Sequence, residues 1–345
     1  MQENNIEQLL IDLLIEQWYT YHLDRDIAPG SDNEMRTSFE EMILSPILKD
    51  SLKKLNPDAD TALLDEAYRK ITHLEWSDIV SKNENFHKLM RNGCTIERFK
   101  DWETRWEYIR FFDLEKIENN DFRVVNQFKV NEDWNNKRFD VVIFINWIPV
   151  VLCEMKNPLD PDADMHHAFT QIQNYQTAIP SFFQYNGICM ISDWLDTKVS
   201  SFTAPYSRYQ TWKNPWDFMN KWDKNWTTLI EWFLTSEIYV TTKNLFDKET
   251  LLNVLANYTV FENEEKKDTF LSGVELFSLY DLGLENIPML EPPMAFGDHY
   301  QEFLTRDKDS LIEEITERIV FRIGKDKVTN WDERVYGAAV YCLDG

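Results

Sequence analysis

The amino-acid sequence has no long apolar run and few cysteines. None of its runs reaches the roughly 18 apolar residues that a membrane span requires, and the acidic start, MQENNIEQLL, lacks the basic and apolar regions of a signal peptide. The four cysteines are scattered without CxxC spacing, and Cys153 and Cys189 lie inside apolar runs, where a reduced, buried thiol is expected. These absences predict a chain without a membrane segment in a reducing cytoplasm.

The chain also has too few basic residues to bind nucleic acid through net charge. It contains 36 Lys and Arg against 60 Asp and Glu, a formal net charge of −24, and an acidic surface repels phosphate. The charge is −8 for residues 1–50 and −10 for residues 251–345, so the middle of the chain is closer to neutral than either end. No G-x-x-x-x-G-K-[ST] pattern occurs, because Gly324-Lys325 is followed by Asp326 and has no matching upstream glycine. We therefore expect no ATP site in this chain.

Apolar spacing of three to four residues predicts helices in the first hundred residues. The candidate segments are Ile6–Trp18, residues 35–57 with an interruption at Pro46, and Thr61–Leu74 with Asp60 as N-cap. From Trp106 the pattern changes to short runs rich in β-branched and aromatic residues, which are typical of strands. These runs are WEYIRFFDL, DFRVVNQFKV, RFDVVIFIN and IPVVLCEMKN, and the two residues Asn146 and Trp147 between the last two predict a hairpin.

Helical spacing returns at Met165–Ile179, and the segments Gly187–Asp193 and Val199–Phe202 again resemble strands. The sequence thus predicts the α/β class. After about residue 214 the pattern is helical and aromatic, and residues 263–345 form an acidic, mostly helical segment that includes SLIEEITERIVFRI. The role of this last segment does not follow from its sequence.

Three ionisable residues interrupt the apolar hairpin. Glu154 and Lys156 are two residues apart on a strand and so point the same way, and pairing around Asn146-Trp147 brings Asp140 next to Glu154. Two buried carboxylates repel each other unless a cation lies between them, and hard oxygen ligands favour Mg²⁺. A lysine beside such an ion can align or deprotonate water, which is the arrangement that phosphodiester hydrolysis requires.

A structural interpretation competes with this hypothesis, because Glu-x-Lys is frequent by chance and can form an ion pair at a sheet edge. The following helix adds Gln171 and Tyr175, which are four residues apart and share a face. Their amide and phenol groups could hydrogen-bond the lysine, a water or a phosphate. They could equally belong to an ordinary amphipathic helix with a half-buried tyrosine.

The combined blocks resemble the N-terminal nuclease domain of the R (HsdR) subunit of type I restriction enzymes, a member of the PD-(D/E)xK endonuclease superfamily. The resemblance covers roughly residues 1–262 and rests on these blocks in family order: IEQLLIDLLIEQWYTYHLDRDIAP, MRTSFEEMILSPILKDSLKKLNP, NENFHKLMRNG, DLEKIENNDFRVVNQFKV, RFDVVIFINWIPVVLCEMKNP, QIQNYQTAIPSFFQYNGICMISD and TAPYSRYQTWK. It implies a restriction-endonuclease-like mixed β-sheet flanked by helices, with a catalytic core at about residues 100–212.

The resemblance also implies residue roles. The metal-binding acid and the Glu-x-Lys of the superfamily fall on Asp140, Glu154 and Lys156, with the Met155 carbonyl as a further metal ligand. The Gln-x-x-x-Tyr motif falls on Gln171 and Tyr175. The acid carried on the first helix of many members would be Glu7, which could also be a solvated helix residue.

The implied activity is Mg²⁺-dependent endonucleolytic cleavage of double-stranded DNA, directed by partner modification (methyltransferase) and specificity subunits. The chain departs from the family at Trp147, where an Asn-Gly turn is usual, and after Glu262, where the family continues into a motor with a phosphate-binding loop. Two alternatives therefore stay open. One is a non-cleaving acidic decoy that engages a restriction complex or a DNA-binding partner, and the other is a nuclease fold that only supports residues 263–345.

Overall fold

The computed structural model describes residues 3–75, 78–100, 102–156, 165–193, 196–212, 236–259 and 261. Contacts divide the chain into two units, Met1–Thr259 and Val260–Gly345, and every element described below belongs to the first unit. The helices expected within residues 263–345, among them SLIEEITERIVFRI, lie outside the described residues. No described helix has the length and apolar character needed to cross a membrane.

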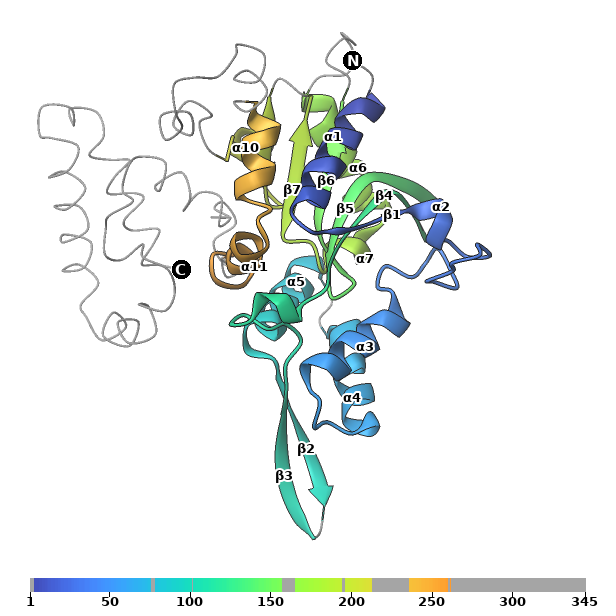
Figure 1. The fold of residues 1–345 in the computed structure, drawn as a ribbon, viewed down its shortest axis with the longest axis vertical. Helices are drawn as coiled ribbons and strands as arrows, with labels where there is room; N and C mark the ends of the chain where they lie inside the picture. The colour runs from blue at the N-terminus through green and yellow to red at the C-terminus, as the bar shows by residue number, and fades with distance from the viewer. Residues whose placement is uncertain are drawn as a thin grey trace, which may run out of the picture. The chain divides into compact units, whose positions relative to one another are not determined.

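A mixed sheet of six strands forms the centre of the first unit, in the order β1-β4-β5-β6-β7-β8 (Figure 1). The strands are β1 (Thr20–Leu23), β4 (Phe122–Glu132), β5 (Asn135–Ile145), β6 (Ile148–Met155), β7 (Ile188–Ser192) and β8 (Thr197–Ser200). The pairs β1–β4 and β6–β7 are parallel, and the other neighbours are antiparallel. The α/β class and the strand segments from Phe122 onward are thereby confirmed.

Helices surround the sheet, and some of them cover its two faces. They are α1 (Glu3–Glu16), α2 (Asp24–Ile27), α3 (Ser45–Leu55), α4 (Thr61–Thr72), α5 (Ile79–Asn92), α6 (Met165–Ala178), α7 (Pro180–Phe183), α10 (Glu237–Asn244) and α11 (Lys248–Asn257). In Figure 1, α1 and α10 lie in front of the sheet and α6 behind it. The α6 side holds a core of aromatic and aliphatic side chains that includes Phe139, Phe144, Tyr175 and Phe182.

The hairpin β5–β6 lies at the centre of this core. Every residue of β6 is buried, as expected for a strand that is paired on both edges and covered on both faces. Its turn residues Asn146 and Trp147 have φ values of 51° and 62°, the left-handed pair of a type I′ turn. The turn is thus the type that Asn-Gly favours, and Trp147 adds contacts: its ring is fully buried against Phe144, with the Arg123 guanidinium 4.6 Å from the ring centroid.

Two expectations for the first hundred residues were wrong. The segment before Pro46 contains turns, and helix α3 begins only at Ser45, with Pro46 in its first turn. Proline has no N–H to donate within a helix, so it opens a helix more readily than it interrupts one. The mostly helical prediction also missed β1 and β2 (Cys94–Lys100). The Asp60 prediction is confirmed, because its carboxylate accepts a hydrogen bond from the Leu63 N–H at 2.9 Å.

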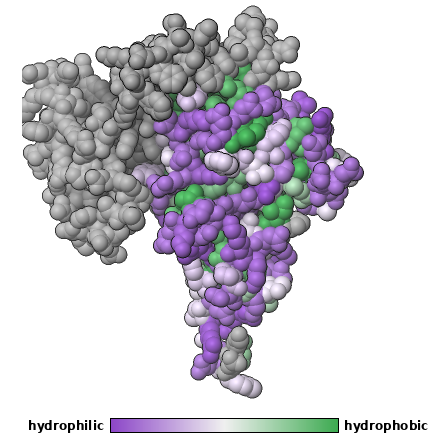
Figure 2. All heavy atoms as spheres, in the orientation of Figure 1, coloured by the Kyte–Doolittle hydropathy of each residue, from purple (hydrophilic) through white to green (hydrophobic). Residues whose placement is uncertain are grey.

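Strands β2 and β3 (Glu103–Ile109) pair only with each other and project away from the central sheet (Figure 1). Phe99, Trp102 and Trp106 on this hairpin are exposed. Figure 2 shows that hydrophilic residues cover most of the described surface on the viewed face, including much of this hairpin. The hairpin is therefore stabilised by its own ladder and by its base.

Candidate active site

Strands β5 and β6 stop pairing with each other next to Asp140 and Glu154. Their ladder ends with the pair Val141–Cys153, so Asp140 and Glu154 lie just beyond the last paired residues. The Met155 N–H, which has lost its partner on β5, donates to Asp140 Oδ2 at 2.9 Å. The divergence of two central strands thus opens a place for two carboxyl groups inside the sheet.

Glu154 and Lys156 form a buried ion pair on one face of β6. Lys156 Nζ lies 2.6 Å from Glu154 Oε1, and Glu154 is completely inaccessible to solvent. No donor among the described residues bonds to Glu154 Oε2. Burial and then the charge of Asp140 raise the pKa of the Glu154 carboxyl well above its ordinary value, despite the opposing effect of Lys156. Two carboxyl groups beside one lysine therefore favour a proton or a cation on Glu154.

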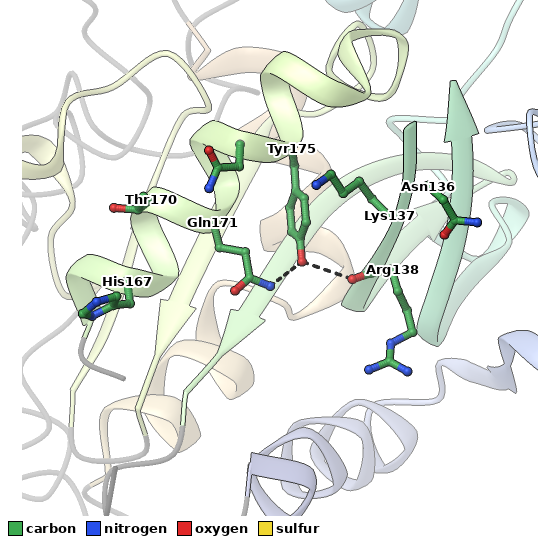
Figure 3. Close-up of a pocket in the computed structure, with 8 residues that line it drawn as sticks. Asn136, Lys137, Arg138, His167, Thr170, Gln171 and Tyr175 are labelled. Atoms are coloured by element: carbon green, nitrogen blue, oxygen red, sulfur yellow. Dashed lines mark hydrogen bonds between the residues drawn. The ribbon is translucent and has the colours of Figure 1, made fainter. Parts of the chain in front are cut away.

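Helix α6 brings Gln171 and Tyr175 to the same place. Gln171 Nε2 donates to the Tyr175 hydroxyl, which itself donates to the Arg138 carbonyl on β5 at 3.1 Å (Figure 3). Burial, and then the charge of Glu154, raise the pKa of the Tyr175 phenol above its usual range, so the hydroxyl stays protonated and remains a donor. The pair joins α6 to the strand that carries Asp140.

Glu7 reaches the sheet from α1. It is 4% exposed, and its Oε2 accepts a hydrogen bond from Gln127 Nε2 at 2.7 Å. Gln127 on β4 lies opposite Asp140 on β5. The β4–β5 ladder pairs the residues on both sides of this position but not these two, and Gln127 has a φ of 57°. Glu7 is therefore a buried residue and not a solvated one. It is bonded to Gln127, the β4 residue opposite Asp140.

Sequence patterns did not single out Gln127. The available signal was the polar pair Asn126-Gln127 within the apolar run of β4, where a half-buried amide needs a partner. That partner comes from α1, and no spacing rule connects residue 7 with residue 127.

The oxygen atoms at the site suit a hard divalent cation. Two carboxyl groups, from Asp140 and Glu154, share a buried place, and one oxygen of Glu154 lacks a donor. Among the described residues, no three His, Cys, Asp or Glu side chains are grouped closely enough to hold a metal by themselves. A small set of carboxylates with water and substrate completing the coordination is how proteins usually bind Mg²⁺. The carboxyl groups of Asp140 and Glu154 therefore suit Mg²⁺ chemically, and the Met155 carbonyl as a third protein ligand stays a prediction.

An open groove of about 470 Å³ adjoins the site. Its walls are the first part of β5, at Asn136, Lys137 and Arg138, and one face of α6. Gln171 and Tyr175 line it as well, so the groove leads to the hydroxyl that contacts β5 near Asp140. Neither Lys137 nor Arg138 was singled out by sequence spacing.

Fold and site together define a mixed α/β protein with a buried acid–lysine site where two central strands diverge. The family model for the N terminus of the type I restriction enzyme R protein matches residues 1–208. The chain belongs to this family, which confirms the resemblance drawn from its sequence blocks.

The chain is also similar to individual endonuclease subunits of type I restriction enzymes. The chain is 28% identical over 265 residues to the type I restriction enzyme HindI endonuclease subunit of Haemophilus influenzae, an alignment covering 76% of this chain and 24% of that protein. It is 25% identical over 305 residues to the putative MjaIXP endonuclease subunit of Methanocaldococcus jannaschii, covering 84% and 28%. It is 28% identical over 272 residues to the EcoprrI endonuclease subunit of Escherichia coli, covering 76% and 75%. The chain thus spans about a quarter of the first two relatives.

Proposed function

We propose that this chain is a Mg²⁺-dependent endonuclease module of the PD-(D/E)xK type that hydrolyses double-stranded DNA. The observation that carries the proposal is the buried group of Asp140, Glu154 and Lys156, in which one Glu154 oxygen has no donor within the part of the chain that the structure describes. The names of the relatives support the reaction class, since they are endonuclease subunits of type I restriction enzymes. By the same analogy, modification and specificity subunits would direct the cleavage.

The residues of the site would have different roles in hydrolysis. Asp140, fixed by the Met155 N–H, and Glu154 would hold Mg²⁺, which when bound supplies charge stabilisation to the scissile phosphate and acidifies water. Lys156 donates a hydrogen bond to Glu154, and an ammonium group in this place can orient the attacking water or a phosphate oxygen. Water then adds to phosphorus, the P–O bond to the leaving sugar oxygen breaks, and a proton passes to that oxygen.

Gln171, Tyr175 and Glu7 would position these groups. The Tyr175 hydroxyl fixes the β5 backbone at Arg138, two residues before Asp140, and Gln171 fixes the hydroxyl. Glu7 and Gln127 support the β4 position opposite Asp140. Catalytic geometry requires such support, because small displacements of reacting groups cost large factors in rate.

A plasmid-nicking assay with Mg²⁺ tests the activity. Glu154→Gln and Lys156→Met should each lower the nicking rate by roughly 1000-fold or more, because a metal ligand or the water-orienting group is lost. Glu84 and Lys88 on α5 form the matched control, since their ion pair has the same 2.6 Å separation but is solvent-exposed. Glu84→Gln and Lys88→Met should leave the rate unchanged, and full nicking by Glu154→Gln would disprove the assignment.

Metal binding provides a second readout that does not depend on turnover. A cation that binds only the folded chain at 100 times its Kd adds about 2.7 kcal/mol of stability, so Mg²⁺ should raise Tm by several degrees. Glu154→Gln should remove most of that increase, whereas Glu84→Gln should retain it. Equal increases in both variants would show that the ion binds elsewhere.

The net charge of −24 favours one rival function, an acidic protein that binds a restriction complex without cutting DNA. Such a protein would show no Mg²⁺-dependent stabilisation at Glu154 and would bind a modification complex equally well as Glu154→Gln. A pull-down with that complex beside the nicking assay separates the two functions.

A further inference from the structure

The outer edge of strand β3 is open to pairing with another strand. The β2–β3 ladder runs without a bulge from Cys94–Ile109 to Lys100–Glu103, and β3 contains no proline or glycine. Figure 1 shows α4 beside β2, whereas no described element lies along the outer edge of β3 near the tip of the hairpin. Exposed edges of natural sheets are usually short, interrupted or covered, because a regular edge pairs readily with a further strand. The edge of β3 has none of these protections.

Hydrogen bonds at the base of β3 show which of its backbone groups face outward. The N–H of Arg110, the residue after β3, donates to Asn56 Oδ1 at 2.9 Å, and Asn56 Nδ2 donates to the Arg110 carbonyl at 2.8 Å. In an antiparallel ladder, successive residues face alternately toward the paired strand and away from it. Thr104, Trp106 and Tyr108 therefore face outward as Arg110 does, and within the described residues their outward N–H and C=O groups have no hydrogen-bond partner. Asn56 takes the place of a neighbouring strand at Arg110 alone.

The same hairpin carries an exposed aromatic face. Trp106 and Tyr108 are exposed, and the ladder register places the exposed Phe99 of β2 on the same face. Most of the surrounding surface on the viewed side is hydrophilic (Figure 2). An exposed apolar patch rimmed by polar residues is typical of a surface that binds another protein. A strand added at the edge would bring its own side chains against these rings.

The other face of β3 has a charge order that is complementary to itself. When two β3 strands pair antiparallel with Trp106 at the centre, Arg105 of each strand lies opposite Glu107 of the other. Opposite charges in directly opposed cross-strand pairs stabilise a sheet, and like charges destabilise it. Moving the centre by one residue would instead oppose Arg105 to Arg105 or Glu107 to Glu107. The charges therefore favour the register centred on Trp106.

This register also fits the end of the open edge. With Trp106 at the centre, Glu103 of the second strand lies opposite Ile109, the last residue of β3. The second strand thus ends one residue before Arg110, where Asn56 occupies the edge. An open pocket of about 320 Å³ lies at this end, between β3 and the segment that follows α3. The pocket leaves room for the turn of the second hairpin.

We propose that the outer edge of β3 pairs with the same edge of a second copy of this chain, which gives a symmetric dimer with the strand order β2-β3-β3-β2. Thr104, Trp106 and Tyr108 of each copy exchange backbone hydrogen bonds with the other copy, and the two Trp106 residues lie opposite each other. The hairpin projects away from the central sheet, so the central sheets of the two copies lie farther apart than the screening length of about 8 Å at physiological salt. The inference goes beyond the proposed endonuclease function and does not depend on it.

Sedimentation equilibrium of the full 345-residue chain tests the dimer. Over a range from about 1 to about 100 µM, where weak complexes dissociate, the average mass should rise from that of one chain toward that of two. Thr104→Pro removes an outward N–H but no bond to β2, so it should raise the dimer Kd by roughly tenfold or more. Thr95→Pro is the matched control, because Thr95 is an exposed threonine whose N–H faces outward on the opposite edge, and it should leave Kd unchanged.

A chain that stays monomeric throughout this range would overturn the proposal, even if β3 paired with a different protein. Equal losses in Thr104→Pro and Thr95→Pro would also overturn it, since they would show that the hairpin and not the β3 edge was damaged.

Charge reversal tests the register. Arg105→Glu opposes two carboxylates at Glu107, and Glu107→Arg opposes two guanidinium groups at Arg105, so each variant alone should dimerise about tenfold more weakly. An equimolar mixture of the two variants should form a heterodimer about as tightly as the wild-type chain dimerises, because every opposed pair again joins opposite charges. Lys88→Glu, at an exposed position on α5, changes the net charge as Arg105→Glu does and should leave dimerisation unchanged.

The mixture separates pairing from a structural defect, because two damaged hairpins would not restore each other. No gain in association over either variant alone would reject the register and with it the proposal. These measurements use neither DNA nor Mg²⁺. A monomeric chain that nicks DNA would therefore reject this inference alone, and a dimer without nicking would reject only the enzyme.

Discussion

Two hairpins of this protein show how much the surroundings of a strand decide its role. The buried hairpin β5–β6 and the projecting hairpin β2–β3 are both antiparallel, and each has a tryptophan with positive φ at its turn. Trp147 in the first is 0% exposed, whereas Trp102 in the second is 91% exposed. β5–β6 is paired with β4 and β7 on its outer edges, whereas no other described strand pairs with β2–β3.

The two hairpins differ in how far their ionic side chains are exposed to water. Inside the sheet, Glu154 and Lys156 are shielded from water and lie 2.6 Å apart, and burial raises the pKa of the Glu154 carboxyl. On the projecting hairpin, Arg98 contacts Asp60 while solvent screens the pair. Similar ionic groups therefore interact more strongly where the tertiary structure excludes water.

The largest expected effect on stability comes from the two turn tryptophans. Trp147→Gly relieves the positive φ but removes a fully buried indole, so it should lower the free energy of unfolding by about 3–5 kcal/mol. Trp102→Gly relieves the same backbone conformation with little loss of packing and should change it by less than about 0.5 kcal/mol. Urea unfolding of both variants measures the difference. Equal losses would show that the turn, and not burial, distinguishes the hairpins.

A smaller effect on stability is expected from His87, near the base of the projecting hairpin. His87 on α5 bonds through Nδ1 to the Leu255 carbonyl on α11 at 2.8 Å, and α5 leads through Gly93 into β2. Burial lowers the pKa of His87 from 6.5 to about 4, with the hydrogen bond to Leu255 opposing this shift and the charge of Arg91 adding to it. The unfolded chain therefore binds a proton between these values that the folded chain does not.

The sign of the pH dependence follows from this difference. The stability contributed by neutral His87 is complete above pH 6.5 and is lost as the pH falls toward 4, at a cost of about 2 kcal/mol between pH 7 and pH 5. His87→Gln keeps an N–H donor but cannot titrate, so it should remove this part of the pH dependence in urea unfolding. His73→Gln, at the exposed end of α4, is the control. A pH profile unchanged by His87→Gln would contradict the argument.

The smallest expected effect concerns Asp60, which caps α4 and also contacts Arg98 on β2. Asp60→Ala should cost about 1 kcal/mol through the lost cap. Asp60→Asn keeps the capping oxygen while weakening the ion pair, so it should cost only a small part of that amount. If Asp60→Asn destabilised the chain as much as Asp60→Ala, the link to the projecting hairpin would matter more than the cap.

Much of the core was predictable because its signals are local. The apolar runs of β4, β5 and β6, the Asn146-Trp147 turn and the four-residue spacing of Gln171 and Tyr175 all depend on neighbours in sequence. The segment before Pro46 was wrongly predicted to be helical. Its apolar residues follow a helical period, but they are carried into the core by a backbone of irregular conformation. There Arg36 forms a buried ion pair with Asp24 and lies 4.2 Å from the centroid of the Phe128 ring.

The sequence alone determined which residues could do chemistry: an acid on one strand, an acid and a lysine on the next, and an amide and a phenol on the helix that follows. Only the tertiary structure decided that β5 and β6 separate at Val141–Cys153, that Glu7 meets Gln127 from α1, and that the Tyr175 hydroxyl reaches the Arg138 carbonyl on β5. The physical reason is that periodicity and turn preference act over a few residues. The exclusion of water and the opposition of charges depend on segments that are distant in the chain and meet only on folding.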